Sequence, residues 1–138
     1  MRWGLKEAWS KHATQCLGGI PSPDGRYLFV PQPDQARVIY DIQRGESRAI
    51  PGSTWHLWPA GWSADSRYLY MYTRAAPPSE IWRVEISNGR ETLVKRVIPT
   101  DPAGILEIFN VVMTPDAKTF VYGYDRYLSE LYVVSGLH

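Results

Sequence analysis

The chain has 138 residues, of which 44% are hydrophobic and 21% charged, so its composition is that of one ordinary globular domain and excludes a disordered chain. Its 15 Lys and Arg nearly balance 14 Asp and Glu, and a formal net charge of +1 offers no electrostatic basis for binding nucleic acid or an anionic membrane surface. No apolar run reaches the roughly 20 residues of a membrane span, so we expect no membrane insertion. Cys16, the single cysteine, excludes an internal disulfide and a cysteine-based zinc cluster.

The first predicted element is a tight turn at residues 22–25, with the sequence Ser-Pro-Asp-Gly. Proline fixes φ at the second position of such a turn, and Gly25 accepts the positive φ that ends it. The β-branched and aromatic residues that follow favour strands. The strands expected in this first unit, which covers about residues 13–50, include 27–30, 39–42 and 46–50.

A second copy of the turn lies at residues 63–66, with the sequence Ser-Ala-Asp-Ser. Ser66 stands where the first turn has glycine, and a positive φ there would cost on the order of 1 kcal/mol. Either the turn changes type or neighbouring groups offset the strain. Asn88-Gly89 is a strong hairpin signal later in this unit. The strands expected in this second unit, which covers about residues 55–98, lie at 55–62, 68–72, 81–84 and 91–97.

A third copy of the turn lies at residues 114–117, where Ala117 replaces the glycine. The turn aspartates are 41 and 51 residues apart, and an aromatic residue follows each of them after 16 or 17 residues. This recurrence predicts that the aromatics pack between neighbouring units. They are Tyr40, Trp82 and Tyr132. The strands expected in the third unit, which covers about residues 105–134, lie at 105–113, after Thr119 and at 131–134.

Four short antiparallel strands in each repeat of about 40–50 residues are typical of a β-propeller blade. We therefore expect an all-β fold, a partial β-propeller of about three four-stranded antiparallel blades in one region that covers residues 1–138. The last blade is expected to be incomplete because the chain ends after its third strand. Three blades are too few to close a propeller, so they predict a fragment, or a half-propeller that self-associates through exposed edges and apolar faces.

The turn Ser-Pro-Asp-Gly-Arg that leads into a strand resembles the WD40-like (PD40) repeat of TolB-type β-propellers. The resemblance covers nearly all of the chain after about Thr14 and implies half of a six-bladed propeller. In such propellers a strand from the start of the propeller fills the gap in the last blade. Here the candidates are residues 1–5 or a strand from another chain.

The last third of the chain, with residues 99–104 and 122–134, looks like the C-terminal end of the propeller attached to bacterial eukaryotic-like serine/threonine protein kinases. None of the kinase motifs is present: the sequence has no Gly-rich loop, no His-Arg-Asp and no Asp-Phe-Gly. Kinase activity therefore carries over to no residue of this chain.

The sequence predicts no catalytic, cofactor-binding or metal-binding residue. With three histidines, a metal site would need carboxylates from separate blades. Ser63 follows Gly61-Trp62 but lacks the second glycine of a nucleophile elbow, so we assign it to the repeat turn. Aspartates recur in these turns because their side chains accept hydrogen bonds from nearby backbone amides. The residues with this structural assignment are Asp24, Gly25, Asp65 and Asp116.

One group of candidate contact residues is Trp55, His56 and Trp58. They lie where the connection between two blades enters the strand nearest the propeller axis, which is a usual place for propeller ligands. Packing is the alternative role for these side chains.

A second group of candidates lies in two loops that occupy the same place in neighbouring blades. Arg126 and Tyr127 belong to the predicted loop 124–127 of the last blade, and both residue types are enriched in binding hot spots. Arg74 belongs to the equivalent loop of the preceding blade. If these loops share a face, the two arginines make it mildly basic; a solvated loop is the alternative.

The leading hypothesis is a non-catalytic module that binds or senses a protein, peptide or envelope ligand and forms the C-terminal part of a larger kinase-associated protein. The first alternative is the substrate-gating propeller of a prolyl-oligopeptidase-like serine peptidase. The second is a structural half-propeller, in which two copies form a homodimer with six blades. No cofactor is implied. The first seven residues lack the apolar core of a signal peptide, and the kinase resemblance leaves an extracytoplasmic or a cytoplasmic location open.

Overall fold

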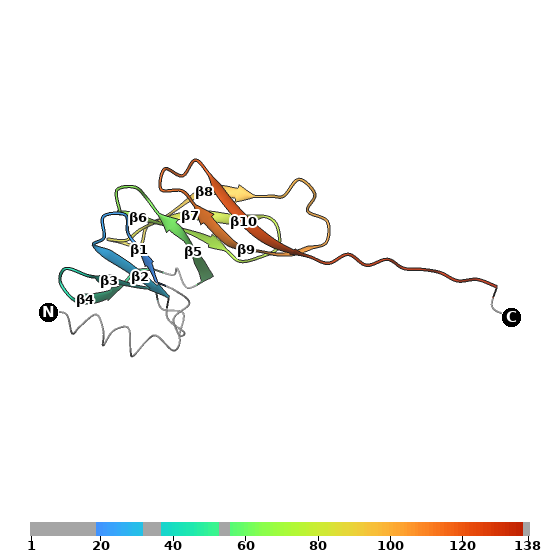
Figure 1. Ribbon diagram of the computed structural model, residues 1–138, viewed down its shortest axis with the longest axis horizontal. Helices are drawn as coiled ribbons and strands as arrows, with labels where there is room; N and C mark the ends of the chain where they lie inside the picture. The colour runs from blue at the N-terminus through green and yellow to red at the C-terminus, as the bar shows by residue number, and fades with distance from the viewer. Residues whose placement is uncertain (1–18, 32–36, 53–55, 137–138) are drawn as a thin grey trace.

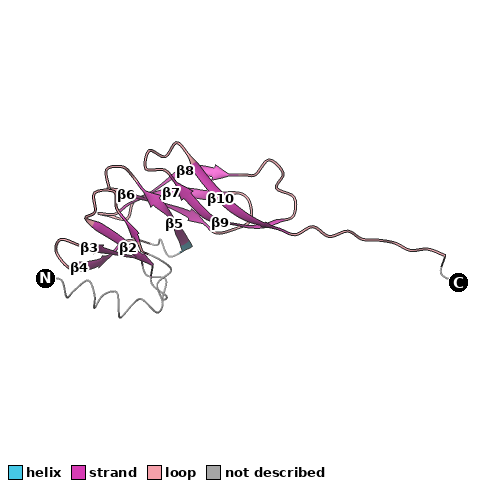
Figure 2. Ribbon diagram, viewed as in Figure 1, coloured by secondary structure: helices cyan, strands magenta, loops and turns pink. Residues whose placement is uncertain are grey.

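The structure is a computed structural model that describes residues 19–31, 37–52 and 56–136 (Figure 1). Its regular elements are strands, and the described residues form no α-helix (Figure 2). The strands are β1 (Ile20–Pro21), β2 (Tyr27–Pro31), β3 (Arg37–Asp41), β4 (Glu46–Ala49), β5 (Leu57–Trp62), β6 (Tyr68–Thr73), β7 (Ser79–Glu85), β8 (Glu91–Val97), β9 (Ile105–Met113) and β10 (Phe120–Arg126).

The strands form three antiparallel sheets in chain order. The first sheet has the order β1-β2-β3-β4, the second β5-β6-β7-β8, and the third consists of β9 and β10. The all-β fold with four-stranded antiparallel blades, expected from the sequence, is confirmed. Residues 1–5, the candidate closing strand, lie outside the described residues, and so does Cys16.

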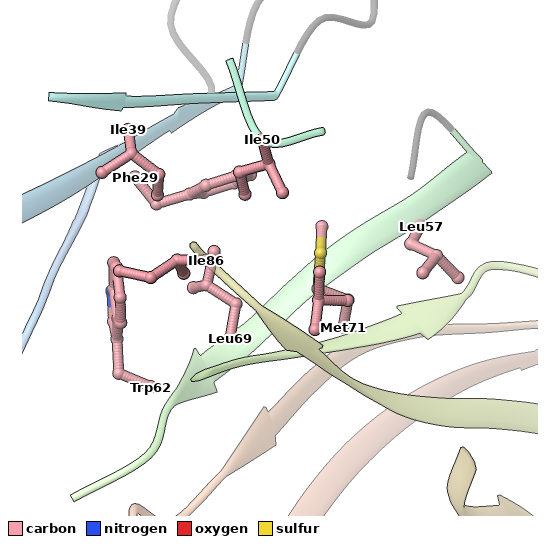
Figure 3. Packing of buried hydrophobic residues seen from close by; sticks show 9 residues of the cluster. Phe29, Ile39, Ile50, Leu57, Trp62, Leu69, Met71 and Ile86 are labelled. Carbon is pink, nitrogen blue, oxygen red and sulfur yellow. The ribbon is translucent and has the colours of Figure 1, made fainter. Parts of the chain in front are cut away.

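Strand β6 lies between two hydrophobic cores, which explains its unbroken run of apolar and aromatic residues. Leu69 and Met71 point into the core between the first and second sheets, where Phe29 and Ile39 meet them (Figure 3). The alternate residues of β6, Tyr70 and Tyr72, point into the core between the second and third sheets. Because successive side chains of a strand point to opposite faces, one strand can serve both cores. The third sheet contributes Ile105, Ile108, Val111 and Met113 to the second core.

Hydrogen bonds from side chains to backbone also join the first sheet to the second. The Trp62 indole donates to the Ile20 carbonyl at 2.9 Å, and its ring stacks on Tyr27 with centroids 6.3 Å apart. The buried guanidinium of Arg37 donates to the Leu57 carbonyl through Nε and Nη2, at 3.1 and 2.7 Å. Hydrogen bonds are directional, whereas burial of apolar surface is not. These bonds therefore restrict the orientation of the first sheet relative to the second.

All three repeat turns keep the positive φ that the sequence left undecided. The value is 70° at Gly25, 58° at Ser66 and 58° at Ala117. The turn therefore does not change type where glycine is lost. Ser66 offsets the strain through its hydroxyl, which accepts the backbone N–H of Asp24 at 3.3 Å, and Ala117 packs against the second core.

The third sheet differs from the expectation. The segment 131–134 was expected to be its third strand, but after β10 the chain forms no strand and runs away from the sheet in an extended conformation (Figure 1). The predicted loop 124–127 is also different, because Tyr124, Asp125 and Arg126 belong to β10 and pair with β9. Strand β9 has nine residues and pairs with β10 along its whole length. Strand β10 therefore continues through residues 124–126, where the sequence predicted a loop.

The recurring aromatic residues do not occupy one equivalent position in the blades. Tyr40 lies opposite Leu28, the fourth residue after its turn aspartate, whereas Trp82 lies opposite Met71, the sixth. Tyr132 lies in no strand and is 79% exposed. The expectation of common packing between blades fits Trp82, which packs against the first core, but it is wrong for Tyr132.

Candidate functional site

The three repeat turns share one hydrogen-bond network. In the first turn the Ser22 hydroxyl donates to Asp24 Oδ1 at 2.6 Å, and the same carboxylate oxygen accepts the backbone N–H of Arg26 at 3.0 Å. The Ser22 hydroxyl also accepts the backbone N–H of Tyr27 at 2.9 Å. The same three contacts recur around Asp65 and Asp116, with Thr114 in place of serine in the third turn.

These contacts explain the electrostatics of the turn aspartates. The hydroxyl of the residue two positions earlier lowers the pKa of Asp24, Asp65 and Asp116, and backbone N–H groups lower it further. A carboxyl group with a lowered pKa is ionised at neutral pH and is poorly suited to donate a proton. The geometry therefore supports the structural role expected from the sequence.

At the other end of the strands, Arg74 binds a carboxylate of the third sheet. Its Nε and Nη2 donate to the two carboxylate oxygens of Glu107 at 2.7 and 3.0 Å, and its guanidinium lies 5.3 Å from the ring centroid of Trp58. The bidentate bond to Glu107 raises the pKa of Arg74. The backbone N–H of Ile108 donates to the Ala75 carbonyl at 2.9 Å. The loop after β6 therefore contacts β9 through a backbone hydrogen bond as well as through the Arg74 side chain.

Arg126 lies at the same end of the third sheet, opposite Ile105 in the pairing of β9 and β10. Its Nη1 donates to the Asp101 carboxylate at 3.0 Å and its Nη2 to the Asp101 carbonyl. Glu107 and Asp125 are paired residues in the same two strands. Two guanidinium groups and three carboxylates thus share this end, so the expected basic character is not found.

The candidate residues of the sequence analysis are therefore only partly brought together. Trp58 and Arg74 are in contact, whereas Trp55 lies outside the described residues. His56 is exposed just before β5, and Trp58 is half-buried against the second core. Tyr127 is exposed, and its backbone N–H donates to the Gly104 carbonyl at 2.8 Å.

The third sheet carries an exposed apolar surface, of the kind expected for an open array of blades, although the sequence did not indicate which residues form it. Leu106, Val112 and Val121 are 62%, 58% and 63% exposed, and Val112 and Val121 are cross-strand neighbours. Other residues of β9 fill the second core, whereas Leu106 and Val112 are not covered. A partial signal was present in the sequence, because residues 105–113 are apolar except for Glu107 and Asn110, and a mostly apolar strand is typical of burial on both faces.

Comparison with known proteins supports the fold. Neither a protein-family model nor a curated protein sequence matches the chain. Among solved structures, the crystal structure of TolB from Acinetobacter baumannii matches with a TM-score of 0.56 and 19% sequence identity, over 80% of this chain and 27% of that chain. The fold is that of a TolB-like β-propeller. This chain spans about a quarter of the TolB chain, so it corresponds to part of such a propeller.

Within the described ranges, no helix is long and apolar enough to cross a bilayer. Across the same part of the chain, no group of three or more His, Cys, Asp or Glu side chains is arranged to hold a metal ion.

Proposed function

We propose that this chain is a non-catalytic protein-binding module, and that its partner docks on the third sheet. The observation that carries the proposal is the contrast between the sheets. Among the described residues, the first two sheets have four strands each and share a core, whereas the third has two strands and leaves Leu106, Val112 and Val121 exposed.

The physical argument rests on the two unsatisfied features of this sheet. Exposed apolar side chains gain free energy when they are covered, at about 25 cal/mol for each Å² removed from water. A free strand edge offers a row of N–H and C=O groups that an extended polypeptide can pair with. A protein or peptide with an exposed strand and apolar side chains matches both features, whereas a small polar ligand matches neither.

The candidate contact residues fit the border of such a surface. Arg74 and Arg126 are held by carboxylates at one end of the third sheet, with Trp58 beneath Arg74 and Tyr127 exposed beside Arg126. Polar groups that are already paired contribute orientation more than affinity at the edge of an interface. His56 lies just before β5 in the second sheet and is exposed.

We propose in addition that the module serves a larger kinase-associated protein, as the resemblance of its last third implies. A kinase domain encoded in the same reading frame would support this part of the proposal. Binding by the third sheet does not depend on it, because the exposed surface is a property of the present residues.

The test is affinity capture with the immobilised chain and an extract of cells that encode it. A triple variant, Leu106→Thr, Val112→Thr and Val121→Thr, removes apolar area from the third sheet while keeping strand-compatible residues. The matched control is Leu93→Thr with Val94→Thr on β8, where the side chains are 37% and 41% exposed.

The proposal expects polypeptides that the unchanged chain and the β8 control retain and the triple variant loses by at least tenfold. Equal retention by all three chains would contradict the third sheet as the docking surface. Substrate turnover by the isolated chain, abolished by one point substitution, would contradict the non-catalytic role.

A further inference from the structure

We infer that the partner of the third sheet is a second copy of this chain, and that the two copies exchange their C-terminal segments as β-strands. The segment concerned, residues 128–134, is called the C-terminal segment below. The inference rests on the proposed function, since it names the polypeptide that pairs with the free edge.

The free edge belongs to β10. Strands β2 and β6, which follow the repeat turn in the first two sheets, each have a strand on both sides. Strand β10 follows the same turn, but among the described residues it pairs with β9 alone. Within the part of the chain that the structure describes, one edge of β10 therefore lacks the third strand that the repeat provides elsewhere.

The C-terminal segment is the third strand that the repeat predicts. It contains Leu131, Tyr132, Val133 and Val134, which are residue types that favour strands. In the structure these four side chains are 92%, 79%, 85% and 72% exposed. The same chain thus contains an exposed apolar segment and, among the described residues, an unpaired strand edge. The backbone N–H and C=O groups of the segment could form hydrogen bonds with those of the edge.

The path of the chain favours an edge of another copy over its own. The hydrogen bond from the Tyr127 N–H to the Gly104 carbonyl holds the chain at the end of β10, and from there the segment continues away from the sheet (Figure 1). Pairing with its own β10 would need the chain to reverse within residues 128–130, whereas the second blade uses the connection 74–78. A three-residue hairpin loop is sterically possible, so pairing with its own edge is the alternative that a monomeric chain would indicate. In the structure the segment makes no such turn (Figure 1).

A second copy meets the edge without any reversal. If each copy donates its segment and receives the other's, the exchange is closed by two-fold symmetry and ends at a dimer. The arriving strand would lie next to β10 and so beside Val121, whereas Val112 on β9 lies one strand further away. The exchange therefore covers the free edge and leaves the outer face of the sheet to other contacts.

The experiment measures the mass of the full chain by light scattering after size exclusion, for three proteins. These are the unchanged chain, Val133→Pro and the matched control Ser135→Pro. Proline removes an N–H donor and cannot sit in the middle of a paired strand. Ser135 lies just outside the C-terminal segment, so the control introduces the same residue without interrupting the strand.

We expect the unchanged chain and Ser135→Pro to have twice the 15.8 kDa chain mass, and Val133→Pro to dissociate at least tenfold more readily. The circular dichroism of Val133→Pro should lose only the contribution of the exchanged strand, because residue 133 contributes to neither core. A synthetic peptide of residues 128–136 should then bind to Val133→Pro in trans, and the same peptide with proline at 133 should not.

Three outcomes would overturn the inference: a monomeric unchanged chain at concentrations up to about 100 μM, a dimer that persists in Val133→Pro, or a peptide that fails to bind. The proposed function is judged separately, by capture of a different polypeptide on the third sheet. If the unchanged chain is monomeric and still retains such a polypeptide, and the Leu106/Val112/Val121 variant does not, protein binding stands and strand exchange fails.

Discussion

The backbone N–H of Asp24 donates to the Ser66 hydroxyl at 3.3 Å and thereby joins the turn of the first sheet to the turn of the second. In the same way, the Ala64 N–H donates to the Pro115 carbonyl at 3.1 Å and joins the second turn to the third. The three turns that recur along the sequence are thus side by side in space. Ser66 has two roles there, because it adopts the positive φ of the turn and also accepts the bond from the neighbouring blade.

The two roles of Ser66 can be separated by substitution. Ser66→Ala keeps the positive φ and loses the acceptor, so we expect the free energy of unfolding to fall by about 1 kcal/mol. Ser66→Gly loses the same acceptor but relieves a backbone cost of about 1 kcal/mol, so its stability should stay close to that of the unchanged chain. Urea unfolding followed by tryptophan fluorescence measures both. Equal losses in the two variants would show that strain at residue 66 is negligible.

Gly61 is predicted to be indispensable for packing of the third sheet. Its φ is +151°, and a Cβ placed there would lie 2.8 Å from the backbone oxygen of Met113 on β9. Gly61→Ala should therefore destabilise the chain by roughly 2 to 4 kcal/mol, through strain and displacement of β9.

The control for this variant is Gly25→Ala. Its φ is +70°, but nothing lies within 4 Å of a Cβ at that position. We expect a loss of only about 1 kcal/mol, from backbone strain alone. Thermal melts of both variants provide the comparison, and equal losses would contradict a specific clash with β9.

The turn aspartates predict a loss of stability in acid. Their folded-state pKa values are lower than usual, first because a serine or threonine hydroxyl donates to each carboxylate. The unfolded chain therefore binds protons more readily, and the stabilising contribution is present above the ordinary aspartate pKa of about 3.9 and lost as the pH falls through the lower folded values. Urea midpoints measured from about pH 6 to about pH 2 should fall with decreasing pH.

Substitution of one turn tests the origin of this slope. Asp65→Asn keeps an acceptor oxygen for Ser63 but removes the titrating group, so the midpoint should depend less steeply on pH. Ser63→Ala removes the largest cause of the lowered pKa and should also reduce the slope. An unchanged slope in both variants would place the acid sensitivity elsewhere in the chain.

The pair Arg74 and Glu107 predicts a modest coupling between the second and third sheets. Both side chains are partly exposed, at 42% and 30%, so solvent and salt screen their interaction. A double-mutant cycle with Arg74→Ala and Glu107→Ala should give a coupling of about 0.5 to 1 kcal/mol, smaller at high salt. Arg74→Lys keeps the charge but not the bidentate geometry, and should lose most of the coupling. A coupling that is insensitive to salt would contradict an electrostatic origin.

The sequence by itself determined the repeat and the blade. The three copies of the turn are local structures, since the hydroxyl, the carboxylate and the amides of each network lie within six consecutive residues, as in Ser22–Tyr27. Local chemistry of this kind is visible in one sequence, and so is the alternation that produces short strands.

Only the tertiary structure decided which blades are complete and which groups meet. Arg74 and Glu107 are 33 residues apart. No local sequence pattern predicts that an arginine in a loop of one blade forms a salt bridge with a strand of the next. The register that places Tyr40 opposite the fourth residue and Trp82 opposite the sixth residue after the turn aspartate depends on the length of the connection between the two paired strands. The exposed face of the third sheet depends on what packs against it. Burial is a property of neighbouring elements, so the sequence showed that Val112 is apolar but could not show that it lies uncovered.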